Sequence, residues 1–203
     1  MKIVTIDFDI IMRPSIESYN YFINEEGCGI DQLEEEFVHF QNCQADLSIY
    51  KLLTDFILNI ESEKIFFISS HKDILQFVND SIDLINIDHH HDLGYSNESY
   101  SEAFEISCGN WVEQLYREDK LKSYTWIHNQ NSLLLIGDQA KIDNDLILSD
   151  ENEMKKYLNN LAQHTDSLII CSSFPWVPSI YRPLFNTWHS ICENKVQKKI
   201  DIL

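Results

Sequence analysis

Hydrophobic and polar residues follow two alternating patterns along this chain. Short apolar runs rich in Ile, Val, Leu and Phe are typical of strands buried on both faces of a sheet, and they occupy residues 2–8, 64–69, 83–87 and 167–172. Apolar residues at helical spacing occupy residues 48–60, 72–80, 110–119 and 151–163. Strands that alternate with helices predict an α/β fold of three layers, in which helices flank a mostly parallel sheet.

The chain's length and the continuity of this pattern predict a single domain over residues 1–203. No internal repeat and no linker rich in Pro, Gly and Ser divides it. Asp46 stands where the N-cap of the helix at 48–60 is expected. The acidic stretch at 31–36 is expected to be the solvated face of a helix.

The charge balance excludes some classes of partner. Thirty-three Asp and Glu against fifteen Lys and Arg give a formal charge of −18, while 44% hydrophobic residues are enough for a packed core. Non-specific binding to nucleic acid or to anionic membranes needs clustered Lys and Arg, so neither partner is expected. The charge fits a cationic partner or metal ions, or serves solubility alone.

Cysteine usage and the first residues predict a reduced, cytoplasmic protein. The five cysteines are odd in number and show no CxxC spacing, so neither a disulfide framework nor a thiolate zinc site is expected. The first residues lack the apolar core and cleavage site of a signal peptide, and no stretch approaches the length of a membrane span.

The strongest chemical signal is a run of five metal-ligand residues, Asp88 to Asp92, directly after the strand at 83–87. In an extended segment alternate residues point to one side, so we expect Asp88, His90 and Asp92 to converge while His89 and His91 face away. A buried carboxylate at a strand end is costly without a cation. Carboxylate and imidazole together suit a divalent transition metal, and an accidental acidic, histidine-rich loop is the alternative.

Two further strand ends carry ligand-type side chains. Asp7 and Asp9 end the first strand, where we expect them on the same side, and His71 follows the second strand. The carboxyl ends of parallel strands meet at one edge of a sheet. Four carboxylates and two imidazoles at that edge predict a site for two ions, which can share a water and lower its pKa.

These motifs resemble those of the arginase/ureohydrolase superfamily. Residues 88–93 (DHHHDL) match its DxHxD metal motif, and residues 5–9 (TIDFD) are similar to its SxDxD motif. Residues 69–71 (SSH) are a looser match to its histidine loop, and residues 107–110 (SCGN) are similar to its Ser-Gly-Asn substrate loop. The length and the DHHHDL form are most similar to the short peptide arginases, which convert arginine side chains of a ribosomally made precursor peptide to ornithine.

The resemblance implies a role for each candidate ligand. Asp88 and Asp7 are expected to bridge two Mn²⁺ ions per chain. The other ligands divide between the ions, His71 and Asp92 on one, and His90 and Asp9 on the other.

The resemblance also implies the reaction. A hydroxide between the ions attacks the guanidinium carbon and yields ornithine and urea, with Asp88, Asp7 and His90 as the catalytic residues. Ser107 and Asn110 are expected to contact the substrate, an arginine-containing precursor peptide. The neighbouring thiol of Cys108 is expected to be buried and inert. The oligomeric state stays open.

Two features depart from the family pattern. The DxD strand precedes DxHxD here, whereas it follows in arginases, which implies a rearranged and shortened version of the arginase/deacetylase-like fold. Trp111 and Val112 stand where the family's proton-shuttle histidine falls, and its guanidinium-binding glutamate has no match by motif.

Two other functions compete with this interpretation. Asp88, His89 and His90 are similar to the motif of the DHH phosphoesterases, although a second Gly-rich motif is missing and the charge would repel a phosphate substrate. A metal-binding module without catalytic activity is the second alternative. Such a module would bind metal but release neither urea nor phosphate, which distinguishes it from the arginase-like enzyme and from the phosphoesterase.

Overall fold

The computed structural model describes residues 1–13, 43–62, 64–94, 106–130, 132 and 141–200. Six strands within them form one parallel sheet: β1 (Lys2–Asp7), β4 (Ile65–Ile68), β5 (Ile82–Ile87), β6 (Leu121–His128), β7 (Asn144–Ile147) and β8 (Ser167–Cys171). Their order across the sheet is β4-β8-β1-β5-β6-β7. The strands β2 (Met12–Arg13) and β3 (Gln44–Ala45) form a separate antiparallel pair. The acidic stretch at 31–36 lies outside the described residues.

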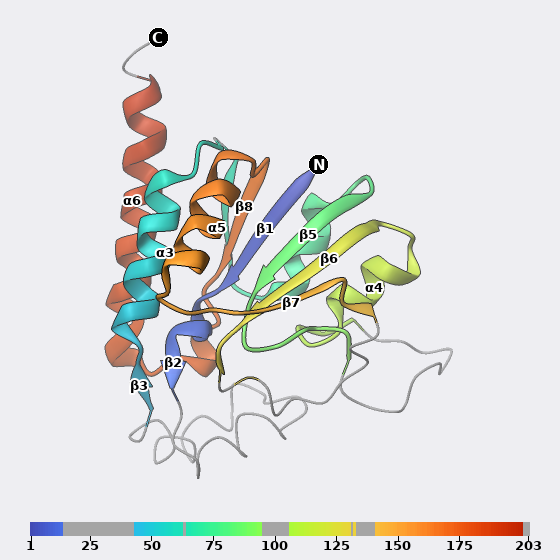
Figure 1. Cartoon of the computed structure of the whole chain (residues 1–203), viewed down its shortest axis with the longest axis horizontal. Coiled ribbons are helices and arrows are strands. Elements are labelled where there is room, and N and C mark those ends of the chain that lie inside the picture. The colour runs from blue at the N-terminus through green and yellow to red at the C-terminus, as the bar shows by residue number, and fades with distance from the viewer. Residues whose placement is uncertain (14–42, 63, 95–105, 131, 133–140, 201–203) are drawn as a thin grey trace.

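Helices cover both faces of the sheet, which confirms the three-layer α/β prediction. The helices α3 (Leu47–Asn59), α5 (Asn152–Gln163) and α6 (Arg182–Ile200) lie together on one face, and α4 (Trp111–Arg117) lies on the other (Figure 1). Val4 and Ile6 of β1 pack in the core under the first group of helices. Ile3 packs in a second core under α4 and the 3₁₀ helix η3 (His71–Phe77). Alternate residues of a strand therefore fill two cores, as a sheet covered on both faces requires.

The helix predicted at 48–60 is α3, and its start follows local chemistry. The side chain of Asp46 accepts hydrogen bonds from the main-chain N–H groups of Ser48 and Ile49, at 3.0 and 3.2 Å. The guanidinium of Arg13 also donates to this carboxylate. These donors hold the pKa of Asp46 below its usual range, although its burial opposes the shift. Asp46 is thus confirmed as the N-cap.

Some elements differ from the sequence prediction. The helix expected at 72–80 is the 3₁₀ helix η3, which ends at Phe77. The strands β6 and β7 and the helix α6 were not predicted. The first strand ends at Asp7, and the next residues form the 3₁₀ helix η1 (Phe8–Ile11). Two further 3₁₀ turns, η6 (Phe174–Trp176) and η7 (Ser179–Tyr181), lead from β8 to α6.

The strand order reverses direction between two neighbouring strands. The chain leaves β1 through α3 toward the edge strand β4, whereas it leaves β5 through α4 toward β6 on the opposite side. Because β1 and β5 are neighbours, their outgoing connections diverge, and this divergence is the topological switch point at which α/β sheets bind ligands. None of the described helices is long and apolar enough to cross a membrane.

Candidate metal centre

The six predicted ligands come together at the carboxyl ends of the strands. Together with Cys171, they fall into overlapping groups whose donor atoms lie within 4.8 Å of one another: Asp9–Asp88–His90, His71–Asp88–Asp92 and Asp7–His71–Cys171. Asp88 belongs to the first two groups and His71 to the last two. The ligands are contributed by the end of β1, the residues after β5 and the first residue of η3.

His71 lies among three carboxylates. Its Nδ1 atom is 3.0 Å from Asp88 Oδ2, 3.2 Å from Asp92 Oδ2 and 3.3 Å from Asp7 Oδ2. Its other ring nitrogen, Nε2, is buried and has no hydrogen-bond partner among the described residues. One ring nitrogen thus faces the carboxylates that are predicted to hold a metal.

Asp9 and His90 lie on the other side of Asp88. The main-chain N–H of His90 donates to Asp88 Oδ1 at 3.0 Å, and the ring atom His90 Nδ1 is 3.5 Å from the same oxygen. Asp9 Oδ1 is buried without a hydrogen-bond partner among the described residues. An unpaired buried carboxylate oxygen is costly, so Asp9 needs a proton or a cation.

The four carboxylates are almost completely buried. Asp7, Asp9, Asp88 and Asp92 are between 1% and 5% exposed. Burial raises the pKa of Asp9 well above its ordinary value, and the charges of Asp7 and Asp88 raise it further. Burial and the charge of Asp88 raise the pKa of Asp92 to about 7. Burial also raises the pKa of Asp7, although the imidazole of His71 opposes this shift.

The two imidazoles offset part of this negative charge. Burial favours neutral His71 and His90, but nearby carboxylates outweigh it. Asp7 and Asp88 hold the pKa of His71 well above its usual range, and Asp88 is the main cause that raises the pKa of His90 to about 10. The same two rings hold the pKa of Asp88 well below its usual range despite burial. The charged imidazoles and the carboxylate of Asp88 therefore stabilise one another.

Side chains around the ligands fix their orientation. Ser173 Oγ donates to Asp7 Oδ2 at 2.5 Å, and Trp111 Nε1 donates to Asp92 Oδ2 at 2.5 Å. Ser173 has a φ of 41°, an uncommon left-handed conformation for a residue other than glycine. Hydrogen bonds from neighbouring side chains typically orient the ligands of metal sites. Sequence reasoning missed this role for Trp111 and Ser173.

The ligands converge through turns, and the predicted strand alternation is wrong. Asp7 caps η1, and Asp9 lies inside that 3₁₀ helix with its N–H 3.2 Å from Asp7 Oδ1. The strand β5 ends before Asp88, and Asp92 has a φ of 53°. The main-chain oxygen of Asp92 accepts from the N–H groups of Val112 and Glu113 at the start of α4, which holds the turn in place.

His89 and His91 belong to none of the ligand groups. His89 Nε2 lies 3.0 Å from the main-chain oxygen of Met12, and its Nδ1 lies 2.8 Å from Ser132 Oγ. Burial and the nearby His90 lower the pKa of His89 to about 4, so its ring is neutral. His91 accepts from the N–H of Leu93 and packs edge-on against Trp126. Both rings thus have their contacts outside the ligand groups, as expected.

The predicted substrate loop lies directly before α4. The main-chain N–H of Ser107 donates to Asn110 Oδ1 at 2.7 Å, and this hydrogen bond closes a turn over residues 107–110. Gly94 N donates to Gly109 O at 3.0 Å, which ties this loop to the end of the ligand segment. Cys108 is exposed, so the expectation of a buried thiol is wrong.

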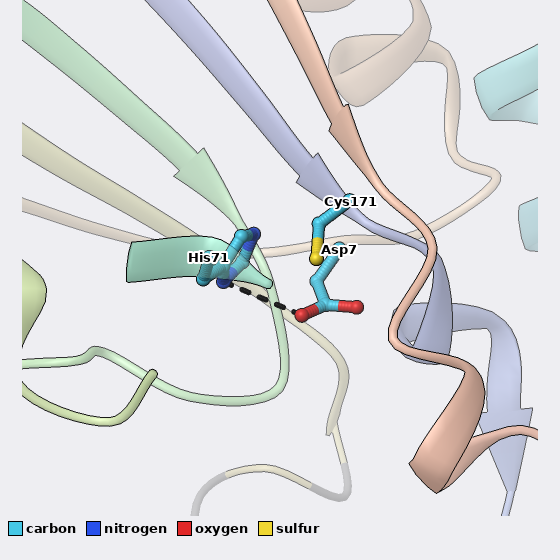
Figure 2. A group of neighbouring side chains, drawn as sticks. All are labelled: Asp7, His71 and Cys171. Carbon is cyan, nitrogen blue, oxygen red and sulfur yellow. Dashed lines mark ion pairs between the residues drawn. The ribbon is translucent and has the colours of Figure 1, made fainter. Parts of the chain in front are cut away.

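Sequence reasoning also missed Cys171. This residue ends β8 and shares a ligand group with Asp7 and His71 (Figure 2). Burial and the charge of Asp7 raise the pKa of its thiol to about 12. In the run SLIIC the cysteine looks like one more apolar strand residue. Only the pairing of β8 with β1 indicates that Cys171 lies beside the ligands.

The residues present fit divalent cations. Four carboxylates balance the charge of two divalent ions, which would replace the protons on the imidazoles. Carboxylate and imidazole are ligands for Mn²⁺, Fe²⁺, Co²⁺ and Zn²⁺. The orphaned Asp9 Oδ1 is an independent sign that a positive group belongs there. Comparisons with protein-family models, with curated proteins and with solved structures find no significant match for this chain.

Proposed function

We propose that this protein is a metal-dependent hydrolase that converts arginine side chains of a peptide to ornithine and urea. The observation that supports it most is the shared position of Asp88. Its carboxylate belongs to one ligand group with Asp9 and His90 and to another with His71 and Asp92. A carboxylate common to two ligand groups is what a pair of bridged ions requires.

The residues divide into two metal positions. Asp9, Asp88 and His90 would hold one ion, and His71, Asp88 and Asp92 the other. Asp7 lies beside His71, so it would join the second ion, and its bridging role is what the resemblance implies. Two bound divalent ions such as Mn²⁺ would supply an acidified water and stabilise negative charge that develops on the substrate.

The surrounding residues would keep the ligands ionised and oriented. Trp111 stabilises the charged form of Asp92 through its indole N–H, and Ser173 does the same for Asp7. Trp126 Nε1 donates to the main-chain oxygen of Asp88 at 3.0 Å and fixes the turn that carries it. Such a preorganised, water-poor shell strengthens the electrostatic interactions of the site.

The chain's charge supports a cationic substrate. A formal charge of −18 attracts an arginine-bearing peptide and repels phosphodiesters, and this steering weakens with salt. A peptide has its α-amino and α-carboxyl groups in amide bonds, so it needs fewer polar contacts than free arginine. The loop at 106–110 would supply such contacts beside the metal centre. A ribosomally made substrate places the proposed reaction in the cytoplasm.

The buried glutamate nearest the loop is engaged elsewhere. Glu113 Oε1 lies 3.0 Å from Arg117 Nε, and its Oε2 lies 2.6 Å from Lys141 Nζ. These ion pairs neutralise Glu113, so the guanidinium would depend on the aspartates of the centre for its charge partner.

The test is mass spectrometry of an arginine-containing peptide incubated with the Mn²⁺-loaded protein. Addition of water and loss of urea lowers the peptide mass by about 42 Da for each arginine converted, and released urea is measured in parallel. We expect conversion of the peptide and little turnover of free arginine. Asp88→Asn should abolish conversion because it weakens both metal positions.

Asp83→Asn is the matched control. Asp83 lies at the other end of β5, where it accepts from Ser123 Oγ at 2.7 Å, so the same substitution should leave activity near the wild-type rate. Hydrolysis of a phosphodiester with no change of peptide mass would refute the proposal in favour of a DHH-type phosphoesterase. Metal binding without either reaction would indicate the non-catalytic module.

A further inference from the structure

Three neighbouring strands bring a thiol to the edge of the metal centre. The strand β8 lies between β4 and β1, and Cys171 is in register with Asp7 of β1 and with Ile68 of β4. Residues in register on adjacent parallel strands point to the same face, about 4.8 Å apart. His71 follows β4 after two residues and belongs to the same ligand group. Strand pairing therefore places a sulfur beside Asp7, and the turn after β4 adds His71.

The donor atoms of this cluster are close enough to share one ion. Those of Asp7, His71 and Cys171 all lie within 4.8 Å of one another, and all three residues are buried. Ligand atoms bonded to one ion at about 2.0–2.3 Å lie at most about 4.5 Å apart, so small side-chain shifts suffice. Figure 2 shows the sulfur beside the side chain of Asp7, whose carboxylate forms an ion pair with a ring nitrogen of His71.

The imidazole of His71 presents one nitrogen to this cluster. His71 is 3% exposed, and its Nδ1 atom lies 3.3 Å from Asp7 Oδ2 and 3.0 Å from Asp88 Oδ2. The cluster thus combines a carboxylate, an imidazole nitrogen that faces it and a thiol, in a place closed to bulk water.

We propose that Cys171 is a thiolate ligand of the ion held at His71, so that the two positions of the centre prefer different metals. This inference rests on the metal centre of the proposed function. On binding, the sulfur would lose its proton to solvent and form a bond to the metal. The position of Asp9, Asp88 and His90 has only oxygen and nitrogen donors and suits Mn²⁺. The position with Cys171 suits softer ions such as Zn²⁺, Co²⁺ or Fe²⁺.

Cobalt is the probe because its spectrum reports bound sulfur. The protein is loaded with Co²⁺, bound cobalt is counted, and a sulfur-to-cobalt charge-transfer absorption is sought in the near ultraviolet. We expect this absorption in the wild type and its loss in Cys171→Ser, while cobalt stays bound. Affinity for Zn²⁺ should fall by at least about 10- to 100-fold in that variant, because loss of a direct ligand weakens binding no less than loss of the outer-shell partners for which this range is typical. Affinity for Mn²⁺ at the other position should change little.

Cys192→Ser is the matched control. Cys192 is also buried, but it packs in the core formed with α6, away from the carboxylates, so its loss should leave the cobalt spectrum intact. Cys171→Ala provides a second variant in case the serine variant does not fold. Bound cobalt without a sulfur band in the wild type would overturn this inference and leave the metal centre standing. Failure of the wild type to bind any cobalt would overturn both.

Discussion

Replacement of Trp111 with phenylalanine tests whether Asp92 is a metal ligand. The indole Nε1 of Trp111 donates to Asp92 Oδ2 at 2.5 Å, and the ring is fully buried in the core under α4. Phenylalanine keeps much of the apolar contact but removes the donor. A hydrogen bond to a charged group contributes about 1.5–3 kcal/mol. Since each 1.4 kcal/mol is about tenfold in affinity, metal binding should weaken by about 10- to 150-fold.

Trp188→Phe is the matched control for this change. Trp188 is also fully buried, and its Nε1 donates to Thr54 Oγ1 at 2.8 Å on the opposite face of the sheet. Both variants lose a buried indole hydrogen bond, so both should lower the free energy of unfolding by about 1–3 kcal/mol. Only Trp111→Phe should weaken metal binding.

Titration calorimetry with Mn²⁺ at fixed pH measures the affinity, and urea denaturation measures the free energy of unfolding. If both variants bind Mn²⁺ as tightly as the wild type, Asp92 is not a ligand and the two-position model is wrong. If Trp111→Phe and Trp188→Phe weaken Mn²⁺ binding equally, the loss of affinity comes from general destabilisation, and the hydrogen bond from Trp111 does not orient Asp92 for metal binding.

Three further predictions follow from the charges and thiols. Because the pKa values of His71 and Asp9 are raised well above their usual ranges, that of His90 to about 10 and that of Asp92 to about 7, metal binding near neutral pH should release at least two protons, measured by calorimetry in buffers of different ionisation heat. Asp46→Ala should lower the free energy of unfolding by about 1 kcal/mol at pH 7. Because the pKa of Asp46 is lowered in the folded state, its ionised carboxylate stabilises the fold at pH values above its unfolded pKa, and this stabilisation is lost as the pH falls through the folded pKa. Denaturation at pH 7 and at pH 3 should therefore show that Asp46→Ala lowers the free energy of unfolding less in acid. Among the described cysteines, exposed Cys108 should react first with an alkylating agent, with peptide mass mapping as the readout, and equal labelling of buried Cys171 would contradict this.

The parts of the fold that could be predicted are those whose pattern is local. The strands at the start of the chain and at 167–171 are continuous apolar runs, and α3 has both helical spacing and an N-cap. The strand β6 begins with alternating polar residues, and β7 is a short, mostly exposed edge strand, so neither shows a long apolar run. Their place in the sheet depends on pairing with distant residues, which no local pattern records.

In the candidate site, too, some features could be predicted from local sequence and others could not. Carboxylates at buried strand ends are conspicuous because their burial needs compensation, so Asp7 and Asp88 stand out in the sequence. The geometry that unites them was not predictable, because Asp9 enters through a 3₁₀ turn and Asp92 through a positive φ. Cys171 gives no local signal because a thiol is apolar enough for a strand interior. Only its register with Asp7 brings it to the centre.

The strand order explains why carboxylates can collect at this point without disrupting the core. Asp7 ends β1, and Asp88 follows β5, its neighbour in the sheet, so both lie beyond the last core residues of their strands. There the connections of the two strands diverge, which is where α/β sheets bind ligands. Four carboxylates gathered at this point repel one another unless protons or cations lie between them. The acidic cluster at the switch point therefore favours a bound cation, which is the physical link between this fold and the proposed metal chemistry.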